Sequence, residues 1–286
     1  MDTAGCHACL EATGIYHLQL ALCLAKTPGI ELMVLNPKGS RRFAEAQLIR
    51  AKTDKVDADG LLEYLHRMGF RLWTPPADEI LELQSLARRR GQLKKEICRE
   101  RSRLHAAGRA GGHTRLAQQD IQHHLHYLAE RAADIERQAI ALMQRHETLA
   151  EELRLVDSIP GFAATSAMKL LAELKGLPVD LRAPQWVAYA GIDPQPKESG
   201  NKTGPRQISK QGNARISDAL FYPAMSASRH DPNVGAFYQS LIARGKTPLQ
   251  ALVAVMRKLL HAIWGMLHHR QPWDGNKFYR LEPLNP

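Results

Sequence analysis

The stretch "IQHHLHYLAERAADIERQAIALMQRHETL" at residues 121–149 carries the clearest periodic pattern in this chain of 286 residues. Its apolar or small residues recur at spacings of four and three, with one interruption at His146. Such a repeat places them along one side of an α-helix, as in the seam of a coiled coil. The seam residues are Ile121, Leu125, Leu128, Ala132, Ile135, Ala139, Leu142 and Leu149. The pattern therefore predicts a long amphipathic helix.

The residues before this stretch predict a second long helix, antiparallel to the first. Between residues 76 and 152 glycine and proline are almost absent, apart from the turn "AAGRAGGHT" at 106–114. A weaker apolar stripe precedes that turn and comprises Leu83, Leu86, Leu93, Ile97 and Leu104. Two long helices joined by a glycine-rich turn form a helical hairpin. Because an exposed seam usually pairs with a second copy, we expect residues 76–152 to make a coiled-coil homodimer.

Basic residues are concentrated around the first arm of this hairpin. Residues 83–115 contain ten Lys or Arg against only Glu96 and Glu100. Across the chain, 39 Lys and Arg face 29 Asp and Glu, and the pI is about 9.6. This balance suits a polyanionic partner, with nucleic acid favoured over a membrane, although other basic enzymes share it.

The charge run itself has two interpretations. Most such runs are the solvated face of a helix. The other interpretation is a phosphate-contacting surface, which would hold a duplex or an RNA without reading its sequence. Its candidate contacts are Arg88, Arg89, Lys94, Lys95, Arg99 and Arg103.

The cysteines and apolar segments bear on where the protein acts. Four cysteines in a chain of this length do not predict a disulfide framework, and Cys6 and Cys9 have no second pair at zinc-ligand spacing. No apolar run approaches the roughly 20 residues that span a bilayer, and the first residues lack a basic signal segment. We expect reduced thiols, no membrane partner and a cytoplasmic location.

Residues 1–75 alternate between strand-like and helix-like patterns. The strand-like runs are "HACLEATG" (7–14) and "IELMVLNP" (30–37), and the helix-like runs are 15–26, 40–52 and 55–68. This alternation favours an α/β layer with a partly parallel sheet. The proline pair in "WTPPADE" at 73–79 predicts the boundary with the hairpin.

Three carboxylates in this α/β region have the spacing of a metal site. Asp54 and Asp57 are three residues apart, so a helix would place both on one face. Glu11, at the end of the first predicted strand, would meet them across the sheet edge. Carboxylates gathered this closely need divalent cations, and two Mg²⁺ ions about 3.5–4 Å apart are usual for phosphoryl transfer. Ordinary surface acids are the alternative for so short a pattern.

Residues 153–286 predict a mostly helical domain. "VDSIPGFAATSAMKLLAEL" at 156–174 has helix–hairpin–helix spacing, which would offer turn amides to a phosphate, and a plain helical turn fits the same residues. A loop rich in Gly, Pro, Ser and Lys (191–213) and three helices (214–229, 233–244 and 247–268) follow. The last helix is apolar nearly all round, so we expect it at the centre of the domain.

Several motifs, taken in order, resemble one family along nearly the whole chain. They are "EATGIYH", "VLNPKGSRRFAEA" and "AKTDKVDADGLLEYL", then "IPGF", "AYAGIDPQPKESG", "ISKQGNARISDALFYPAMSA" and "GKTPLQALVAVMRKLL". Together they are similar to the DEDD-type transposases of the insertion-sequence one-ten family, also called bridge-RNA-guided recombinases. The resemblance implies a RuvC-like, ribonuclease-H-type fold for residues 1–75 and a transposase domain for residues 153–286.

The resemblance also implies roles for the carboxylates. Four acids bind Mg²⁺ in the family. Glu11 in "EATG" matches the second of them, and Asp54 and Asp57 in "KTDKVDA" match the third and fourth. The first acid lies on an opening strand well before the glutamate, and Asp2 lacks that context. We therefore expect a truncated RuvC-like domain with an incomplete metal site.

A serine of the C-terminal domain is the nucleophile of the family, and Ser199 in "KESGNKTG" matches it. A serine hydroxyl attacks a phosphate only when its proton is removed or charge is withdrawn. Lys197, Lys202, Arg206 and Lys210 surround it in sequence and would hold phosphate oxygens. Without the resemblance, Ser-Gly in such a loop indicates an ordinary turn.

These observations lead to one expected function and two alternatives. The resemblance implies a transposase that cuts and rejoins DNA through a phosphoserine intermediate, with Mg²⁺, as a dimer or tetramer. The resemblance also implies that the protein binds a structured guide RNA and that it is associated with the bacterial nucleoid. The missing first acid favours a catalytically inactive nucleic-acid-binding remnant instead. A metal-dependent junction nuclease is the third interpretation, and it leaves "KESG" without a role.

Overall fold

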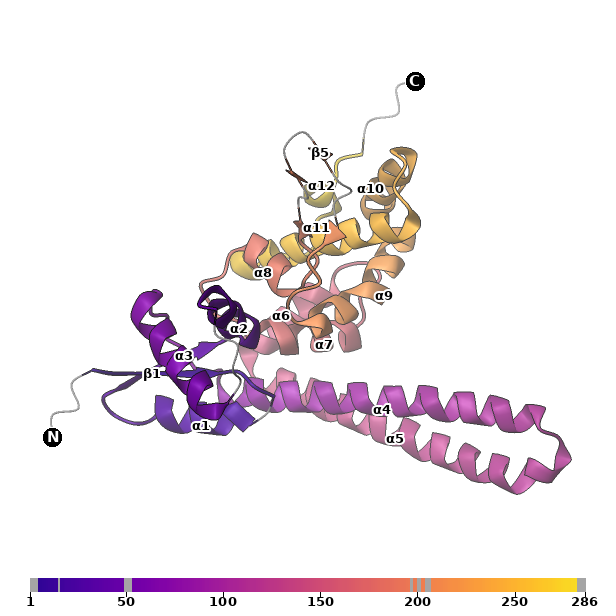
Figure 1. Cartoon of the computed structure of the whole chain (residues 1–286). Helices are drawn as coiled ribbons and strands as arrows, with labels where there is room; N and C mark the ends of the chain where they lie inside the picture. The colour runs from indigo at the N-terminus through magenta and orange to yellow at the C-terminus, as the bar shows by residue number, and fades with distance from the viewer. Residues whose placement is uncertain are drawn as a thin grey trace. The chain divides into compact units, whose positions relative to one another are not determined.

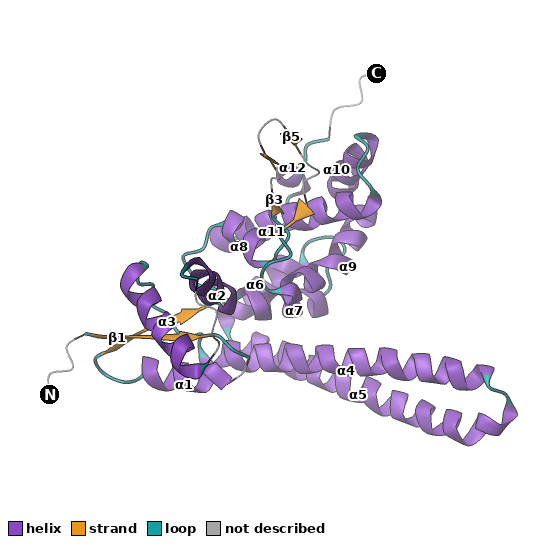
Figure 2. Ribbon diagram, viewed as in Figure 1, coloured by secondary structure: helices purple, strands orange, loops and turns teal. Residues whose placement is uncertain are grey.

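The structure is a computed structural model that describes residues 5–14, 16–48, 53–195, 198–199, 202–203 and 207–281. It divides into two compact units, Met1–Ala77 and Asp78–Pro286 (Figure 1). The described residues are mostly helical, with short two-stranded sheets (Figure 2). The predicted order, α/β first and then mostly α, is confirmed at this level. A RuvC-like fold and a coiled coil remain predictions.

The first unit is built on two parallel strands, β1 (Cys6–Glu11) and β2 (Ile30–Leu35). The strands pair from Cys6 opposite Ile30 to Glu11 opposite Leu35. Helix α1 (Tyr16–Ala25) supplies the crossover that a parallel pair requires. Among the described residues of this unit, the buried side chains are those of Ala21, Leu32, Met33 and Leu35. The partly parallel sheet predicted for this region is therefore present as one strand pair.

Helices α2 (Pro37–Ala46) and α3 (Asp54–Arg67) complete the first unit, and α3 packs against β1. The Asn36 side chain accepts a hydrogen bond from the amide of Lys38, and Pro37 takes the first helical position. The Asn-Pro pair thus starts a helix as well as ending a strand. Helix α2 therefore begins at Pro37, whereas we predicted a start at residue 40. Residues 49–52 of that prediction lie outside the described residues.

A long helical hairpin opens the second unit. Helices α4 (Asp78–Arg109) and α5 (Arg115–Arg145) pack along each other and are joined through a short 3-10 turn, Gly112–Thr114. Leu93 and Ile97 of α4 meet Leu128 and Ala132 of α5 in a small buried cluster of their own. The two predicted seams therefore cover each other within one chain. Pairing of the hairpin with a second copy remains a prediction.

The second arm ends earlier than its repeat suggests. His146 has φ −107° and ψ 109°, which is extended backbone and stops α5. Helix α6 (Glu147–Asp157) starts at the next residue and packs on α7 (Ala164–Leu174). Leu149 therefore belongs to the main core and not to the hairpin seam, which corrects the prediction of one continuous helix.

The remaining helices pack around one large core. They are α8 (Ala183–Tyr189), α9 (Ala214–His230), α10 (Pro232–Ala243), α11 (Pro248–His269) and α12 (Gly275–Phe278). Val255, Leu259 and Ile263 are fully buried, which confirms α11 as the centre. Leu83 and Met143 at the base of the hairpin join the same core. The hairpin and these helices thus form one unit, and a domain boundary at 152/153 remains a prediction.

The turn between α6 and α7 is packed against α9. Gly161 has φ +94°, and a Cβ on it would lie 2.4 Å from the backbone nitrogen of Ala227. Ile159 and Phe162 on either side are buried. Because α9 closes this face of the turn, the plain helical turn fits better than a helix–hairpin–helix phosphate site.

Candidate functional site

Ser199 lies on a short β-ribbon between α8 and α9 in the chain. The ribbon consists of β3 (Pro194–Gln195) paired with β6 (Gln207–Ile208), and β4 (Glu198–Ser199) paired with β5 (Lys202–Thr203), both antiparallel. Ser199 ends β4 directly opposite Lys202. The ribbon therefore brings together the backbones of the predicted nucleophile and one of its predicted basic partners. Lys197 and Arg206 lie outside the described residues.

Hydrogen bonds join the foot of this ribbon, which is Asp193 together with Ser209 and Lys210, to the residues that follow α8. The amide of Ser209 donates to the carbonyl of Asp193, and the amide of Lys210 to the carbonyl of Gly191, each at 3.0 Å. The Ser209 hydroxyl and the Gln195 amide group both donate to the Asp193 carboxylate. Lys210 has φ +51°, and its side chain is exposed. Lys210 therefore lies where the ribbon joins the helical core, and its contact with a phosphate stays a prediction.

The ribbon rejoins the core through a close backbone approach. Gly212 has φ +141°, and a Cβ there would lie 2.1 Å from the carbonyl oxygen of Tyr189. The next amide, that of Asn213, donates to the same carbonyl at 2.6 Å. Only glycine fits this position. The path of the chain from the serine ribbon into α9 is thereby set by contact with α8.

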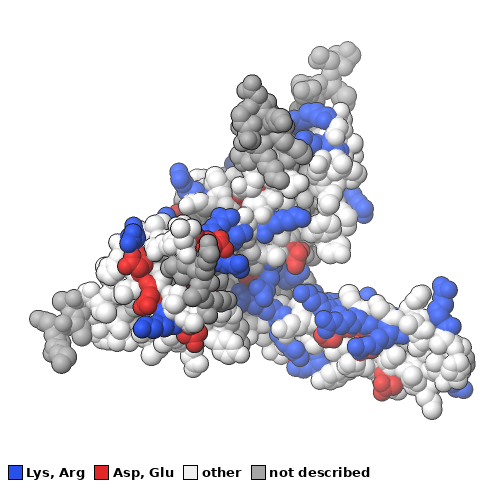
Figure 3. Space-filling model, in the orientation of Figure 1, with Lys and Arg blue, Asp and Glu red and all other residues white. Residues whose placement is uncertain are grey.

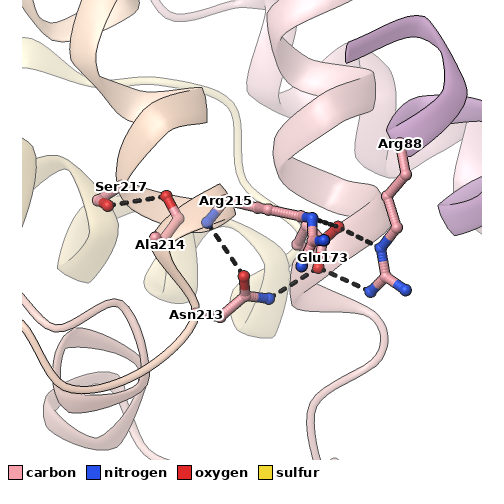
Figure 4. Close-up of polar contacts among 6 residues, drawn as sticks. All are labelled: Arg88, Glu173, Asn213, Ala214, Arg215 and Ser217. Carbon is pink, nitrogen blue, oxygen red and sulfur yellow. Dashed lines mark hydrogen bonds and ion pairs between the residues drawn. The ribbon is translucent and has the colours of Figure 1, made fainter. Parts of the chain in front are cut away.

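A buried carboxylate, Glu173 of α7, links the hairpin to the start of α9 (Figure 4). Arg88 of α4 donates to both of its oxygens, at 2.9 and 3.0 Å. The Asn213 side chain caps α9 through its oxygen and donates from its nitrogen to Glu173 at 2.7 Å. The Arg215 guanidinium lies 4.0 Å away. The Glu173 side chain is only 4% exposed, so these partners replace water around its charge.

The charge of Glu173 is favoured by this arrangement. Burial raises the pKa of Glu173, but hydrogen bonds from Arg88 and Asn213 and the charges of Arg88 and Arg215 outweigh it and leave the pKa below the ordinary 4.5. A lowered pKa in the folded state contributes stability above the unfolded pKa. That contribution is lost as the pH falls through the folded pKa.

The Glu173→Gln variant is expected to lose about 2–4 kcal/mol of unfolding free energy at neutral pH, because Arg88 and Asn213 lose a buried, charged acceptor. Urea unfolding at a series of pH values measures this loss. The gap between the variant and the parent protein should be full at neutral pH and close as the pH falls below 4.5. Glu96→Gln, which removes an exposed pair with Arg99, serves as the control. A gap that does not change with pH would contradict this assignment.

The structure divides the predicted nucleic-acid contacts of α4. Arg88 is held by Glu173 and so has a structural role, while its contact with a phosphate stays a prediction. Arg99 and Arg103 are 64% and 63% exposed but pair with Glu96 and Glu100. Arg89, Lys94 and Lys95 are exposed and form no ion pair among the described residues. Figure 3 shows Lys and Arg side chains gathered along the hairpin.

The predicted metal ligands lie in the first unit. Glu11 ends β1 and is half-buried, and its oxygens accept hydrogen bonds from Thr13 at 2.7 Å and Ser40 at 2.6 Å. Asp54 and Asp57 are exposed in the first turn of α3, where the helix dipole favours negative charge. In the part of the chain that the structure describes, no three His, Cys, Asp or Glu side chains are close enough to hold a metal ion. The described helices also include none long and apolar enough to cross a membrane.

Glu173 and Asn213 were missed by reasoning from the sequence. A signal for Glu173 was present, since one acid interrupts the apolar run "MKLLAEL" at 168–174 and a buried acid requires a partner. Its partners lie 85 and 40 residues away along the chain, so no local pattern identifies them.

Comparisons with known proteins agree along the chain. A family described as "Transposase", of the DEDD IS110 type, matches residues 2–107, and the "Transposase IS116/IS110/IS902 family" matches residues 153–239. The pilin gene-inverting protein of Moraxella bovis is 26% identical over 275 residues, which are 96% of this chain and 83% of that protein. That of Moraxella lacunata is equally similar.

A transposase that carries the insertion-sequence name supports the same assignment. The transposase of insertion sequence IS1111A from Coxiella burnetii is 29% identical over 127 residues, which are 43% of this chain and 35% of that protein. The two matching families cover the first unit with the first arm of the hairpin, and the helices around the Ser199 ribbon, in the order that the sequence motifs suggested. The chain therefore belongs to the IS110 family of insertion-sequence transposases.

Proposed function

We propose that this transposase cuts and rejoins DNA through a covalent bond between Ser199 and a DNA phosphate. The observation that carries the proposal is the backbone pairing of Ser199 with Lys202, on a ribbon whose foot is fastened to α8 and α9. This pairing places the two residues opposite each other along the backbone. Two relatives that match 96% of this chain are named for inverting a pilin gene, and inversion requires strands to be rejoined as well as cut.

The proposed chemistry conserves phosphodiester bonds. The Ser199 Oγ attacks the phosphorus, its proton goes to a base, and the bond from phosphorus to one deoxyribose oxygen breaks and leaves a strand hydroxyl. A hydroxyl of the new partner strand then attacks the phosphoserine and releases Ser199. Since one phosphate ester replaces another in each step, no external energy source is needed. Lys202 and Lys210 would stabilise the charge that develops on the phosphate oxygens.

The carboxylates of the first unit fit a divalent cation by their chemistry, because Mg²⁺ prefers hard oxygen ligands. DEDD transposases normally use such a metal. Glu11, Asp54 and Asp57 would hold Mg²⁺, and a bound ion would have to draw them closer than they lie in the described structure. When bound, the ion would withdraw charge from a DNA phosphate and so make it a better target for attack. Hydroxyl donors from Thr13 and Ser40 orient Glu11 for this role.

The exposed cations of α4 would hold the nucleic acid. Changing Arg89, Lys94 and Lys95 together to glutamine is expected to flatten the dependence of log affinity on log salt by roughly 0.9 for each phosphate that these side chains neutralise. Fluorescence anisotropy of a labelled duplex across a salt series measures this slope. Arg131, Arg137 and Arg145 of α5, changed likewise, are the charge-matched control. Equal slopes for the two triple variants would remove α4 as the contact surface.

A structured RNA and assembly into dimers or tetramers are part of the proposal. An RNA offers the same phosphates as DNA to the exposed cations of α4, and binding of the element's own transcript would test this. Because the seams of the hairpin are covered within one chain, a dimer would use other surfaces. Sedimentation with and without nucleic acid would report the assembly.

Trapping tests the central proposal. The protein is incubated with end-labelled DNA from the flanks of its element, the neighbouring transcript and Mg²⁺, then denatured and digested. A denaturation-resistant protein–DNA band, with the nucleotide mapped by mass spectrometry to the peptide of Ser199, is the expected result. Nucleic-acid binding without a band at any Mg²⁺ concentration would favour the second candidate, a binding protein without turnover. This second candidate is supported by the carboxylates, because among the described residues no three of them lie close enough together to hold a metal ion.

A further inference from the structure

Two cationic side chains and one histidine of α11 line a cavity of about 320 Å³ next to the start of the serine ribbon. They are Arg257, Lys258 and His261. The other walls include Val187 of α8, Phe237 of α10, and Asp193 and Pro194, where the ribbon begins. The cavity therefore lies where the ribbon meets the helical core.

These three side chains face the cavity because of their positions on α11. Arg257 and His261 are four residues apart and share one side of the helix, while the residues around them are buried in the core. Lys258 Nζ lies over the rings of Phe237, Phe278 and Tyr279, at 4.3, 4.9 and 5.1 Å from their centroids. These rings fix the position of the ammonium group by cation–π contact.

The charges of this cavity are only partly compensated. Within the described residues, Arg257, Lys258 and His261 form no ion pair or side-chain hydrogen bond. Asp193 is the acid on the wall, and its oxygens already accept hydrogen bonds from Ser209 and Gln195. Burial lowers the pKa of Lys258 and of His261, and the charge of Arg257 adds to the lowering at His261. A bound anion would relieve this repulsion.

We propose that this cavity binds a backbone phosphate of the same DNA strand that Ser199 attacks. The Arg257 guanidinium and the His261 ring would donate hydrogen bonds to the phosphate oxygens, and the caged Lys258 would add a fixed positive charge. This site rests on the proposed function only for the identity of the strand. It would hold the strand at the foot of the ribbon while the serine reacts further along it.

The distance along the ribbon agrees with one continuous strand. Ser199 follows Pro194 by five residues, which span at most about 17 Å of extended chain. B-form DNA advances about 3.4 Å per nucleotide on each strand. The phosphate in the cavity would therefore lie within roughly five nucleotides of the scissile one.

The test compares Arg257→Gln with Arg244→Gln. Arg244 ends α10 and donates only to Ser240 among the described residues, so it is matched in charge but lies outside the cavity. Affinity for a short fluorescein-labelled duplex is measured across a salt series. Arg257→Gln is expected to flatten the slope by about 0.9, the value for one phosphate, while Arg244→Gln leaves it unchanged and Arg257→Lys restores it. His261→Ala, at an exposed position, should weaken binding without loss of fold in urea unfolding.

The trapping assay provides a second, independent measurement. If Ser199 reacts, Arg257→Gln should lower the yield of the covalent band about tenfold, as the loss of one charge-assisted hydrogen bond predicts. A slope change without any covalent band in the parent protein would support the phosphate site and reject the serine chemistry. Equal slopes for Arg257→Gln and Arg244→Gln would overturn the site, whatever the covalent yield. A parent protein that does not bind the duplex would overturn both proposals.

Discussion

The Ser199→Ala variant is expected to form no covalent protein–DNA band, a loss of more than about a thousandfold, because no other group at that position would attack the phosphate. Alanine removes the hydroxyl without adding bulk to a two-residue strand. Binding of DNA should stay within about twofold of the parent protein, since one neutral hydroxyl contributes little to phosphate affinity. Denaturing gels of end-labelled DNA measure the first quantity and anisotropy measures the second.

Ser217→Ala is the matched control for this loss. Its hydroxyl donates to the carbonyl of Ala214 in the first turn of α9, near the foot of the ribbon, and has no proposed role in the chemistry. The band should persist in this variant. Mg²⁺-dependent cutting that continues in Ser199→Ala would contradict a serine nucleophile and favour a metal-dependent nuclease.

The Gly161→Ala variant is expected to lose at least about 3 kcal/mol of unfolding free energy, because two penalties add. An L side chain at φ +94° is strained, and its Cβ would lie 2.4 Å from the backbone nitrogen of Ala227. Neither partner gives way easily, since the contact is with the backbone of α9. Urea unfolding followed by far-ultraviolet circular dichroism measures the change.

Gly265→Ala in α11 provides the comparison. A Cβ at Gly265 meets nothing within 4 Å and the residue is helical, so alanine there should stabilise the protein by up to about 1 kcal/mol. If both glycine variants unfold at the same urea concentration, the turn between α6 and α7 does not pack on α9 as described.

The helices were predictable because periodicity is local. The spacing of apolar residues located both arms of the hairpin and the buried α11. Periodicity does not say what covers an apolar stripe. Leu128 and Ala132 could be buried equally well by a second copy or by the other arm of the hairpin. Only the tertiary structure shows that the other arm covers them. The break at His146 was also hidden, since the residues around it have no Gly or Pro.

The motifs predicted which residues form the candidate site, which remains a prediction, but they did not predict the geometry around it. Ser199 was identified by resemblance alone, because Ser-Gly in a polar loop has no pattern of its own. Arg88 shows the limit of charge counting. In the sequence it is one of ten basic residues, and in the structure it is bound to an acid of α7. Neither its partner nor the lining of the cavity at Arg257 can be derived from spacing along the chain.

Glu173 links the first arm of the hairpin to the start of α9, which follows the serine ribbon. One carboxylate holds Arg88 at the base of the hairpin and Asn213 at the start of α9, so a tilt of the arm strains the anchor of the loop. Force applied to the arm by a long nucleic acid would thus reach the start of α9 through this carboxylate as well as through the apolar core that the hairpin shares with the other helices. Changing Arg88 to alanine would weaken this polar link between α4 and the start of α9 while leaving the apolar packing of the hairpin in place.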